Sequence, residues 1–116
     1  MRDLIRVFRA LSDETRIRIL KLLLERESLC VCEIMQALDI SQTRASRNLS
    51  ILRDAGFLKD ERKGVWIHYS INREAVNKYC LPIASLLKNW LNDNKRIIED
   101  RERLSKAVKL SEKSGC

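Results

Sequence analysis

The chain has 116 residues, of which 45% are hydrophobic and 34% charged, and its formal net charge is +7. No apolar run approaches the ~18 residues that a membrane span requires, and the start does not look like a signal peptide, so we expect a cytoplasmic protein with no membrane partner. The positive charge favours a polyanionic partner such as nucleic acid, although a basic balance also serves solubility alone.

Two amphipathic helices are predicted in the first 24 residues. Apolar side chains at helical spacing form the stripe of the first helix: Leu4, Val7, Phe8 and Leu11. Ser12 is expected to cap the second helix, with acidic Asp13 and Glu14 in its first turn, where the helix dipole favours them. The stripe of the second helix is Ile17, Leu20 and Leu24. We expect this helix to pack beneath the later ones.

Residues 30–56 predict two more helices joined by a tight turn. The apolar face of the first is Val31, Ile34, Met35 and Leu38. The second opens at Ser41, a good N-cap residue, and ends at Gly56, which readily takes the left-handed conformation that closes a helix. Two helices with so short a link form a helix-turn-helix, whose second helix can enter the major groove of DNA.

Polar side chains on the second helix are the candidates for DNA contact. Those expected at base edges or nearby phosphates are Gln42, Thr43, Ser46 and Arg47. Those expected mainly on the DNA backbone are Ser41, Arg44, Arg62 and Lys63. For Arg44 a solvated helix face is the alternative.

The pattern changes to a period of two after Gly56. Phe57 and Leu58 start a strand, residues 59–64 read as a charged turn, and residues 65–71 alternate apolar and polar side chains as a half-buried strand does. A β-hairpin directly after a helix-turn-helix predicts a winged helix, mainly α-helical, with its wing over residues 57–71.

A long C-terminal helix is predicted over about 82–106, because Pro82 fits the first turn of a helix better than its interior. Its heptad seam is Ile83, Leu87, Trp90, Asn94, Ile97, Arg101, Leu104 and Val108. We expect the seam up to Ile97 to form a homodimer interface together with Leu4 and Phe8 of the N-terminal helix, and Asn94 to set its register. The alternative is that the helix folds back on its own domain. We expect a single domain over residues 1–108 and a flexible tail over residues 109–116.

The composition offers no catalytic constellation. The single histidine, His68, lies in a predicted strand and is expected to be a hydrogen-bonding residue rather than a metal ligand, and the chain has no glycine-rich phosphate loop. The four cysteines, Cys30, Cys32, Cys80 and Cys116, match neither a zinc-finger spacing nor a disulfide framework. An enzyme is therefore not expected.

Several stretches together resemble the ArsR/SmtB family of winged-helix metalloregulatory repressors. They are residues 12–20 (SDETRIRIL), 29–33 (LCVCE), 41–49 (SQTRASRNL), 52–56 (LRDAG) and 64–69 (GVWIHY). The Leu-Cys-Val-Cys box further resembles the arsenic-responsive members. The resemblance implies a homodimer that represses a metalloid-resistance operon and leaves double-stranded operator DNA when arsenite or antimonite binds to Cys30 and Cys32.

One departure from the arsenic-responsive pattern concerns the third cysteine, which in that subgroup follows the pair by about a turn. Here Met35 or a neighbour occupies that place, and core packing is its expected role. A third thiolate would have to come from Cys80 or Cys116, of this subunit or the other. Residues i and i+2 of a regular helix point about 200° apart, so the first turn must be irregular, or must unwind, for Cys30 and Cys32 to hold one ion.

Other readings keep the DNA-binding module and change the role of the cysteines. In these readings the cysteines sense oxidants, electrophiles or another soft metal, or they only pack in the core of a constitutive DNA binder. A metalloid carrier that uses the cysteines alone leaves the basic wing and the recognition helix without a purpose.

Overall fold

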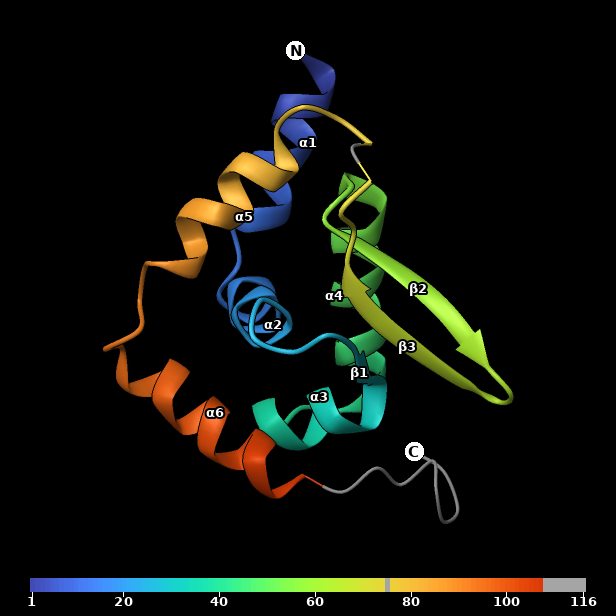
Figure 1. Ribbon diagram of the computed structural model, residues 1–116, viewed down its shortest axis with the longest axis vertical. Helices are drawn as coiled ribbons and strands as arrows, with labels where there is room; N and C mark the ends of the chain where they lie inside the picture. The colour runs from blue at the N-terminus through green and yellow to red at the C-terminus, as the bar shows by residue number, and fades with distance from the viewer. Residues whose placement is uncertain (75, 108–116) are drawn as a thin grey trace.

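A computed structural model of the chain describes residues 1–74 and 76–107, and within them the fold is mainly helical with one small sheet (Figure 1). The helices are α1 (Arg2–Leu11), α2 (Glu14–Leu23), α3 (Val31–Leu38), α4 (Gln42–Ala55), α5 (Cys80–Lys88) and α6 (Lys95–Lys106). The strands are β1 (Leu29–Cys30), β2 (Leu58–Lys63) and β3 (Trp66–Ile71). This is the predicted winged helix-turn-helix. No helix in the described residues is long and apolar enough to cross a bilayer.

The helix-turn-helix is closed by local signals at each of its ends. Asp39 takes the left-handed conformation after α3, and the Ser41 side chain accepts a hydrogen bond from the backbone N–H of Arg44 at the start of α4. Gly56 ends α4 with φ 105°, and a Cβ there would approach Asn77 Nδ2 to 2.9 Å. Only glycine satisfies both that dihedral angle and that contact.

The junction between α1 and α2 corrects one predicted cap. Ser12 terminates α1, and its hydroxyl donates to the backbone oxygen of Phe8. Asp13 is instead the N-cap of α2, where its carboxylate accepts from the backbone N–H of Arg16 at 3.1 Å. Serine and aspartate are nearly equally favourable as N-caps. With Ser12 and Asp13 adjacent, the sequence therefore does not decide which of the two begins α2.

The sheet is larger than the predicted hairpin. Strand β1 pairs antiparallel with β3, which pairs antiparallel with β2, so the order is β1-β3-β2. Residues 59–63, predicted as a charged turn, are strand, and the turn is confined to Gly64 and Val65, with Gly64 at φ 67°. The wing projects from the helical body (Figure 1). Residues 59–65 are exposed, whereas Trp66 and Ile67 of β3 are half-buried. Burial therefore imposes no alternation on the charged residues of β2.

The core lies around α2, whose apolar residues are almost fully buried, and it collects one face of each helix that surrounds α2. Its largest fully buried apolar side chains are Val7, Ile19, Leu20, Leu22, Leu23, Leu29, Ile34, Leu49, Leu52, Phe57 and Leu58. Two charged residues of α2, Arg18 and Lys21, are buried as well. Their partners lie in the C-terminal part of the chain.

That C-terminal part corrects the prediction of one helix over 82–106. Helix α5 ends at Lys88, Leu91 takes a positive φ of 65°, and α6 starts after Asn94, so the chain turns and α6 packs against α3 and α2 (Figure 1). Pro82 does lie in the first turn of α5. Asn94 is the N-cap of α6 and accepts from the backbone N–H groups of Arg96 and Ile97, so it sets no coiled-coil register.

The break also changes the predicted dimer seam. Leu87 and Ile97 are buried within the chain's own core, as the folding-back alternative supposed for this segment. Ile83 and Leu4 are half-buried, whereas Phe8 and Trp90 leave about half of their surface exposed, at 52% and 54%. The seam position Val108 and the expected tail at 109–116 lie outside the described residues.

Candidate nucleic-acid interface and cysteine pair

Helix α4 presents most of the predicted DNA-contacting side chains to solvent. Ser41, Gln42, Thr43, Arg44 and Arg47 are exposed, and Ser46 is half-buried. On the wing, Arg62 and Lys63 are exposed on β2, next to the Gly64–Val65 turn. The candidate DNA interface thus consists of the outer side of α4 and the outer half of the wing.

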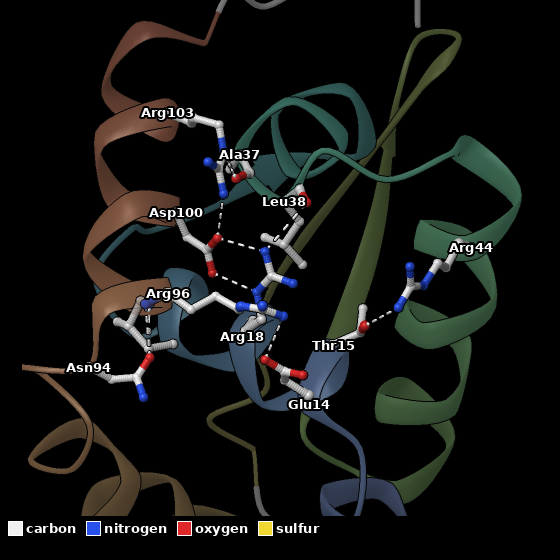
Figure 2. Close-up of polar contacts among 11 residues, drawn as sticks. Glu14, Thr15, Arg18, Ala37, Leu38, Arg44, Asn94, Arg96, Asp100 and Arg103 are labelled. Atoms are coloured by element: carbon white, nitrogen blue, oxygen red, sulfur yellow. Dashed lines mark hydrogen bonds and ion pairs between the residues drawn. The ribbon is translucent and has the colours of Figure 1, made fainter.

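Besides its expected contact with the DNA backbone, Arg44 forms a hydrogen bond within the protein that its position in the sequence does not reveal. Its Nη2 donates to the Thr15 hydroxyl at 2.9 Å, so the side chain extends from α4 toward α2 (Figure 2). A phosphate contact by Arg44 would have to use its remaining donors or replace this bond. Arg47 lies one turn further along the same helix and is exposed.

A network that sequence reasoning missed fixes α4 against α1. The Arg16 guanidinium donates to the backbone oxygens of Ala10 and Arg9 at the end of α1, at 2.7 and 3.2 Å, and to Asn48 Oδ1 at 3.0 Å. Asn48 in turn donates to the backbone oxygen of Arg44. Arg16 thereby adds a charged donor to two carbonyl groups at the end of α1, of which that of Arg9 also accepts from the backbone N–H of Ser12, and it links α1 to α4 through Asn48. An arginine next to apolar residues gave no hint of this role.

The wing is tied to α4 by an exposed ion pair. Arg53 Nη1 lies 3.0 Å from Asp60 Oδ2, so the last turn of α4 contacts the base of β2. The Asp60 hydrogen bond also raises the pKa of the Arg53 guanidinium. An exposed pair of this kind contributes little to stability, but it orients the wing relative to α4.

The cysteine pair lies where the sheet meets the helix-turn-helix. Cys30 ends β1 and is also the N-cap of α3, with extended backbone angles (φ −80°, ψ 161°), while Cys32 is the second residue of α3. The spacing of the cysteines did not predict a disulfide. Because Cys30 is not helical, however, the two side chains converge, and their sulfur atoms are joined in a disulfide with Cα atoms 5.4 Å apart. This is the irregular first turn that helical geometry required.

The surroundings of the pair connect it to the start of α3 and to the wing. Both cysteines are buried, each 1% exposed, and Glu33 Oε1 accepts a hydrogen bond from the backbone N–H of Cys30 at 3.0 Å. In the sheet, Cys30 stands opposite His68 of β3. A change in the distance between the sulfur atoms would therefore act on the start of α3 and on the wing at once.

Cys80 lies at a different place in the fold. Its Sγ donates to the backbone oxygen of Ala55 at 3.3 Å, at the C-terminal end of α4, whereas Cys30 borders a groove together with Ser46 near the N-terminal end. Nine residues of helix separate Ser46 from Ala55, about 14 Å along the axis. In this structure Cys80 of the same subunit thus lies at the opposite end of α4 from the pair. Cys116 lies outside the described residues.

A metal site with three or more ligands is not preformed in the described part of the chain. No group of three His, Cys, Asp or Glu side chains there is placed to hold one ion, and His68 belongs to no such group. Sequence reasoning assigned His68 to hydrogen bonding rather than to a metal, and the structure places it half-buried in β3.

We expect Cys80 to resist alkylation in the folded protein. It is 3% exposed, and burial raises the pKa of its thiol, so at pH 8 little of it is the reactive thiolate. Labelling with iodoacetamide in native buffer should be at least about tenfold slower than in guanidinium chloride, where burial is lost. Mass spectrometry of the Cys80 peptide measures both rates, and equal rates would contradict the buried position.

Comparison with known proteins identifies relatives of the same architecture. The family model described as "Bacterial regulatory protein, arsR family" matches residues 13–60. The chain is 40% identical over 101 residues to the arsenic resistance transcriptional regulator ArsR1 of Pseudomonas putida, covering 84% of this chain and 79% of that protein.

Two solved structures extend the similarity to the fold. One is the homodimeric winged helix-turn-helix DNA-binding domain of a possible ArsR-family regulator from Mycobacterium bovis, with a TM-score of 0.63, 28% identity, and coverage of 74% of this chain and 75% of that one. The other is the AntR antimony-specific transcriptional repressor, with a TM-score of 0.59, 30% identity, and coverage of 72% and 71%.

Proposed function

Because the chain belongs to the ArsR family of bacterial regulatory proteins, we propose that it represses transcription as a homodimer on operator DNA and is released by trivalent arsenic or antimony. The family consists of transcriptional regulators, not enzymes. A regulator of this kind acts where the DNA is, which is the cytoplasm. The observation that supports trivalent arsenic or antimony as the inducer is the pair of converging cysteine sulfurs at the first turn of the helix-turn-helix.

The DNA-binding part of the proposal rests on the exposed side of α4. Gln42, Thr43 and Arg47 are free to meet base edges or phosphates, and a short, basic wing tip with Arg62 and Lys63 can reach the backbone beside the groove. The net charge of +7 favours such contacts. Ser41, Arg44 and Ser46 complete the proposed set at the start of α4.

The homodimer is supported by apolar side chains that the single chain leaves exposed on α1 and at the end of α5. They are Ile5, Phe8, Leu86 and Trp90, each between 42% and 54% exposed. Aromatic residues are enriched in protein interfaces, and a two-fold dimer would bring two recognition helices to successive major grooves. The Mycobacterium bovis relative is a homodimer by its own description.

The chemistry of the inducer follows from two soft ligands. A cellular thiol first reduces the Cys30–Cys32 disulfide by exchange, which yields two cysteine thiols and one disulfide of the reductant. Arsenite then forms two As–S bonds and loses two hydroxyl groups, which leave with the thiol protons as water, and arsenic remains trivalent. Its third position keeps a hydroxyl group or takes a third thiolate, for which Cys116 is the candidate within this subunit.

Once the disulfide is reduced, the two sulfurs are free to move apart, and an arsenic atom bonded to both of them fixes the separation between Cys30 and Cys32. Cys30 is held in the sheet by β3 and Cys32 is held in α3, so the separation is expected to shift the helix-turn-helix against the wing. A hundredfold loss of operator affinity needs only about 2.7 kcal/mol of coupling between the two sites, within the usual range for allosteric proteins.

The test is fluorescence anisotropy of the reduced protein on DNA from upstream of its own gene, titrated anaerobically with arsenite or antimonite. We expect arsenite to weaken DNA binding by about a hundredfold. The Cys30→Ser protein should bind DNA normally and should stay bound when arsenite is added. Cys80→Ser is the matched control and should respond like the unmodified protein. Arg47→Ala should lower DNA affinity with or without arsenite. DNA binding that arsenite leaves unchanged in the unmodified protein would overturn the proposed inducer.

The disulfide between Cys30 and Cys32 favours a second candidate, a thiol redox switch at the same place. In that case a peroxide accepts the two electrons of the dithiol, the disulfide forms and water is released. Peroxide-dependent release of DNA without any response to arsenite would favour this function. If Cys30→Ser and Cys32→Ser alter no response at all, the cysteines serve packing in a constitutive DNA binder.

A further inference from the structure

Three arginines form a stripe along one side of α1. Arg2, Arg6 and Arg9, the arginine stripe, follow one another at i, i+4 and i+7, and all three are exposed. Within residues 1–74 and 76–107, none of their guanidinium groups has a hydrogen-bond or ion-pair partner. The arginines of α2 and α6, by contrast, have partners inside the protein: Arg16, Arg18, Arg96, Arg101 and Arg103. The positive charge of α1 is therefore available to a partner outside the chain.

The arginine stripe does not stabilise the helix that carries it. Arg2 and Arg6 are like charges at i and i+4, which repel each other, and Arg2 lies in the first turn, where the helix dipole disfavours a positive charge. The carboxylate of α1, Asp3, acts on another group: burial is the main reason that the pKa of Cys80 is raised, and the charge of Asp3 adds to it. Charges that weaken their own helix and have no internal partner indicate an external partner of opposite charge.

The position of α1 places the arginine stripe beside the recognition helix. Helix α1 packs against α4, and the wing packs against α4 from the other side (Figure 1). The Arg16 guanidinium joins the end of α1 to Asn48 in the middle of α4. At the start of α1, Asp3 lies near Cys80, whose Sγ donates to the backbone oxygen of Ala55 at the end of α4. Helix α1 thus follows α4 from its middle to its C-terminal end.

The order of the side chains around α1 shows which way the arginine stripe faces. Val7 and Ala10 are buried in the core, and Asp3 marks the side toward the end of α4. The exposed Ile5 and Phe8 mark the side of the proposed dimer contact. At about 100° per residue, the arginine stripe lies between Asp3 and Ile5 around the helix. It therefore faces solvent between α4 and the dimer contact.

We propose that the arginine stripe binds phosphate groups of the operator DNA between the two half-sites. This inference rests on the proposed function, because it requires the homodimer on DNA. A two-fold dimer brings its two copies of α4 to successive major grooves, and α1 lies on the dimer side of α4, next to the DNA backbone that separates those grooves. Arginine pairs with phosphate whatever the base, so the stripe adds affinity and positions the dimer without reading sequence.

The packing of α1 favours DNA over an anionic membrane, the other partner that a basic amphipathic helix can bind. Membrane binding would require α1 to insert its apolar face into lipid. Val7 and Ala10 of that face are 0% and 1% exposed, and Ile5 and Phe8 belong to the proposed dimer contact. A fixed row of positive charges without a free apolar face suits a phosphate backbone.

The experiment measures how operator affinity depends on salt, by fluorescence anisotropy of the unmodified protein, Arg6→Gln and Arg26→Gln. Each phosphate contact releases about 0.9 of a counterion. Arg6→Gln removes one contact from each protomer, so the slope of log K against log salt should decrease by about 2 per dimer. Arg26→Gln is the matched control and should leave the slope unchanged. Arg26 is exposed beyond α2, at the end farthest from the contact of Arg16 with α4.

Hydroxyl-radical footprinting at low salt locates the contact on the operator. The unmodified protein should protect the backbone between the half-sites as well as the half-sites themselves. The triple variant Arg2→Gln/Arg6→Gln/Arg9→Gln should lose the central protection and keep that of both half-sites. Sedimentation velocity should show that this variant is still a dimer, since the substitutions leave Ile5 and Phe8 in place.

Four results overturn the phosphate contact while operator binding by the unmodified protein still supports the proposed function. They are an unchanged slope in Arg6→Gln, an equal decrease in Arg26→Gln, central protection that persists in the triple variant, and a monomeric triple variant that protects no part of the operator. The last result would assign the arginine stripe to the dimer contact instead. If the unmodified protein binds no operator DNA at any salt concentration, the proposed function itself is refuted.

Discussion

Replacing Asp100 with alanine should lower the free energy of unfolding by about 3–5 kcal/mol, the largest effect that we expect from any single substitution in this chain. The carboxylate is 1% exposed, and it accepts hydrogen bonds from Arg18 Nε at 2.8 Å and Arg18 Nη2 at 2.7 Å. Arg103 Nη2 donates to the same carboxylate at 2.9 Å (Figure 2). The hydrogen bond to Asp100 is also the main reason that the pKa of Arg18 is raised.

The cost is expected to be high because Arg18 stays behind. Its guanidinium is buried in α2, and without Asp100 it keeps only a 3.4 Å hydrogen bond to the backbone oxygen of Leu38. A buried charge left without its partner costs more than the pair contributed. The double replacement Arg18→Met with Asp100→Leu should therefore be less destabilising than Asp100→Ala alone.

Denaturant unfolding followed by circular dichroism measures these differences. Glu102→Ala is the matched control, because Glu102 is an exposed carboxylate on the same helix, and its effect should stay within about 0.5 kcal/mol. An Asp100→Ala protein as stable as Glu102→Ala would show that the ion pair does not hold α6 against α2. The same variant should bind DNA more weakly, since Arg18 and Arg103 also donate to the backbone oxygens of Leu38 and Ala37 at the end of α3.

Local signals decided how far the fold was predictable. Ser41 and Gly56 define α4 through hydrogen bonds and dihedral angles of residues close in sequence, and the prediction of that helix is confirmed. Helical geometry also left two possibilities if Cys30 and Cys32 are to hold one ion, an irregular first turn or one that unwinds on binding, and the structure has the first. Neither argument needed knowledge of a distant part of the chain.

The parts that could not be predicted depend on contacts between distant residues. Apolar residues at heptad spacing continue through residues 83–104, but the same spacing also fits two separate helices that pack on one core. Asn94 illustrates the ambiguity, because an asparagine in a seam and an asparagine at a helix start are the same letter in the sequence. The groove that Cys30, Ser46 and Trp66 line likewise exists only once β3 lies beside α3 and α4.

Lys21 provides the contact that ends α5, and it is the residue whose replacement tests why the predicted long helix is broken. Lys21 is 2% exposed, and its Nζ donates to the backbone oxygens of Leu87, Lys88 and Trp90 at 2.9, 3.2 and 2.6 Å. It also donates to Asn92 Oδ1 at 2.8 Å. One ammonium group thus binds the backbone oxygens at the end of α5 and in the turn after it, of which the Leu87 and Lys88 oxygens also accept from Trp90 N–H and Asn92 Nδ2.

We expect Lys21→Met to lower the free energy of unfolding by about 1–3 kcal/mol, because methionine fills the space but leaves the backbone oxygen of Trp90 without a donor and removes the charged donor from the oxygens of Leu87 and Lys88. Burial lowers the pKa of Lys21, which shows that the charged form carries a desolvation cost, so the loss of the hydrogen bonds must exceed the relief of that cost for the prediction to hold. Lys88→Met is the matched control, since the Lys88 side chain is exposed at the end of α5. If Lys21→Met is as stable as Lys88→Met, the turn after α5 is determined by the packing of α6 and not by the captured carbonyls.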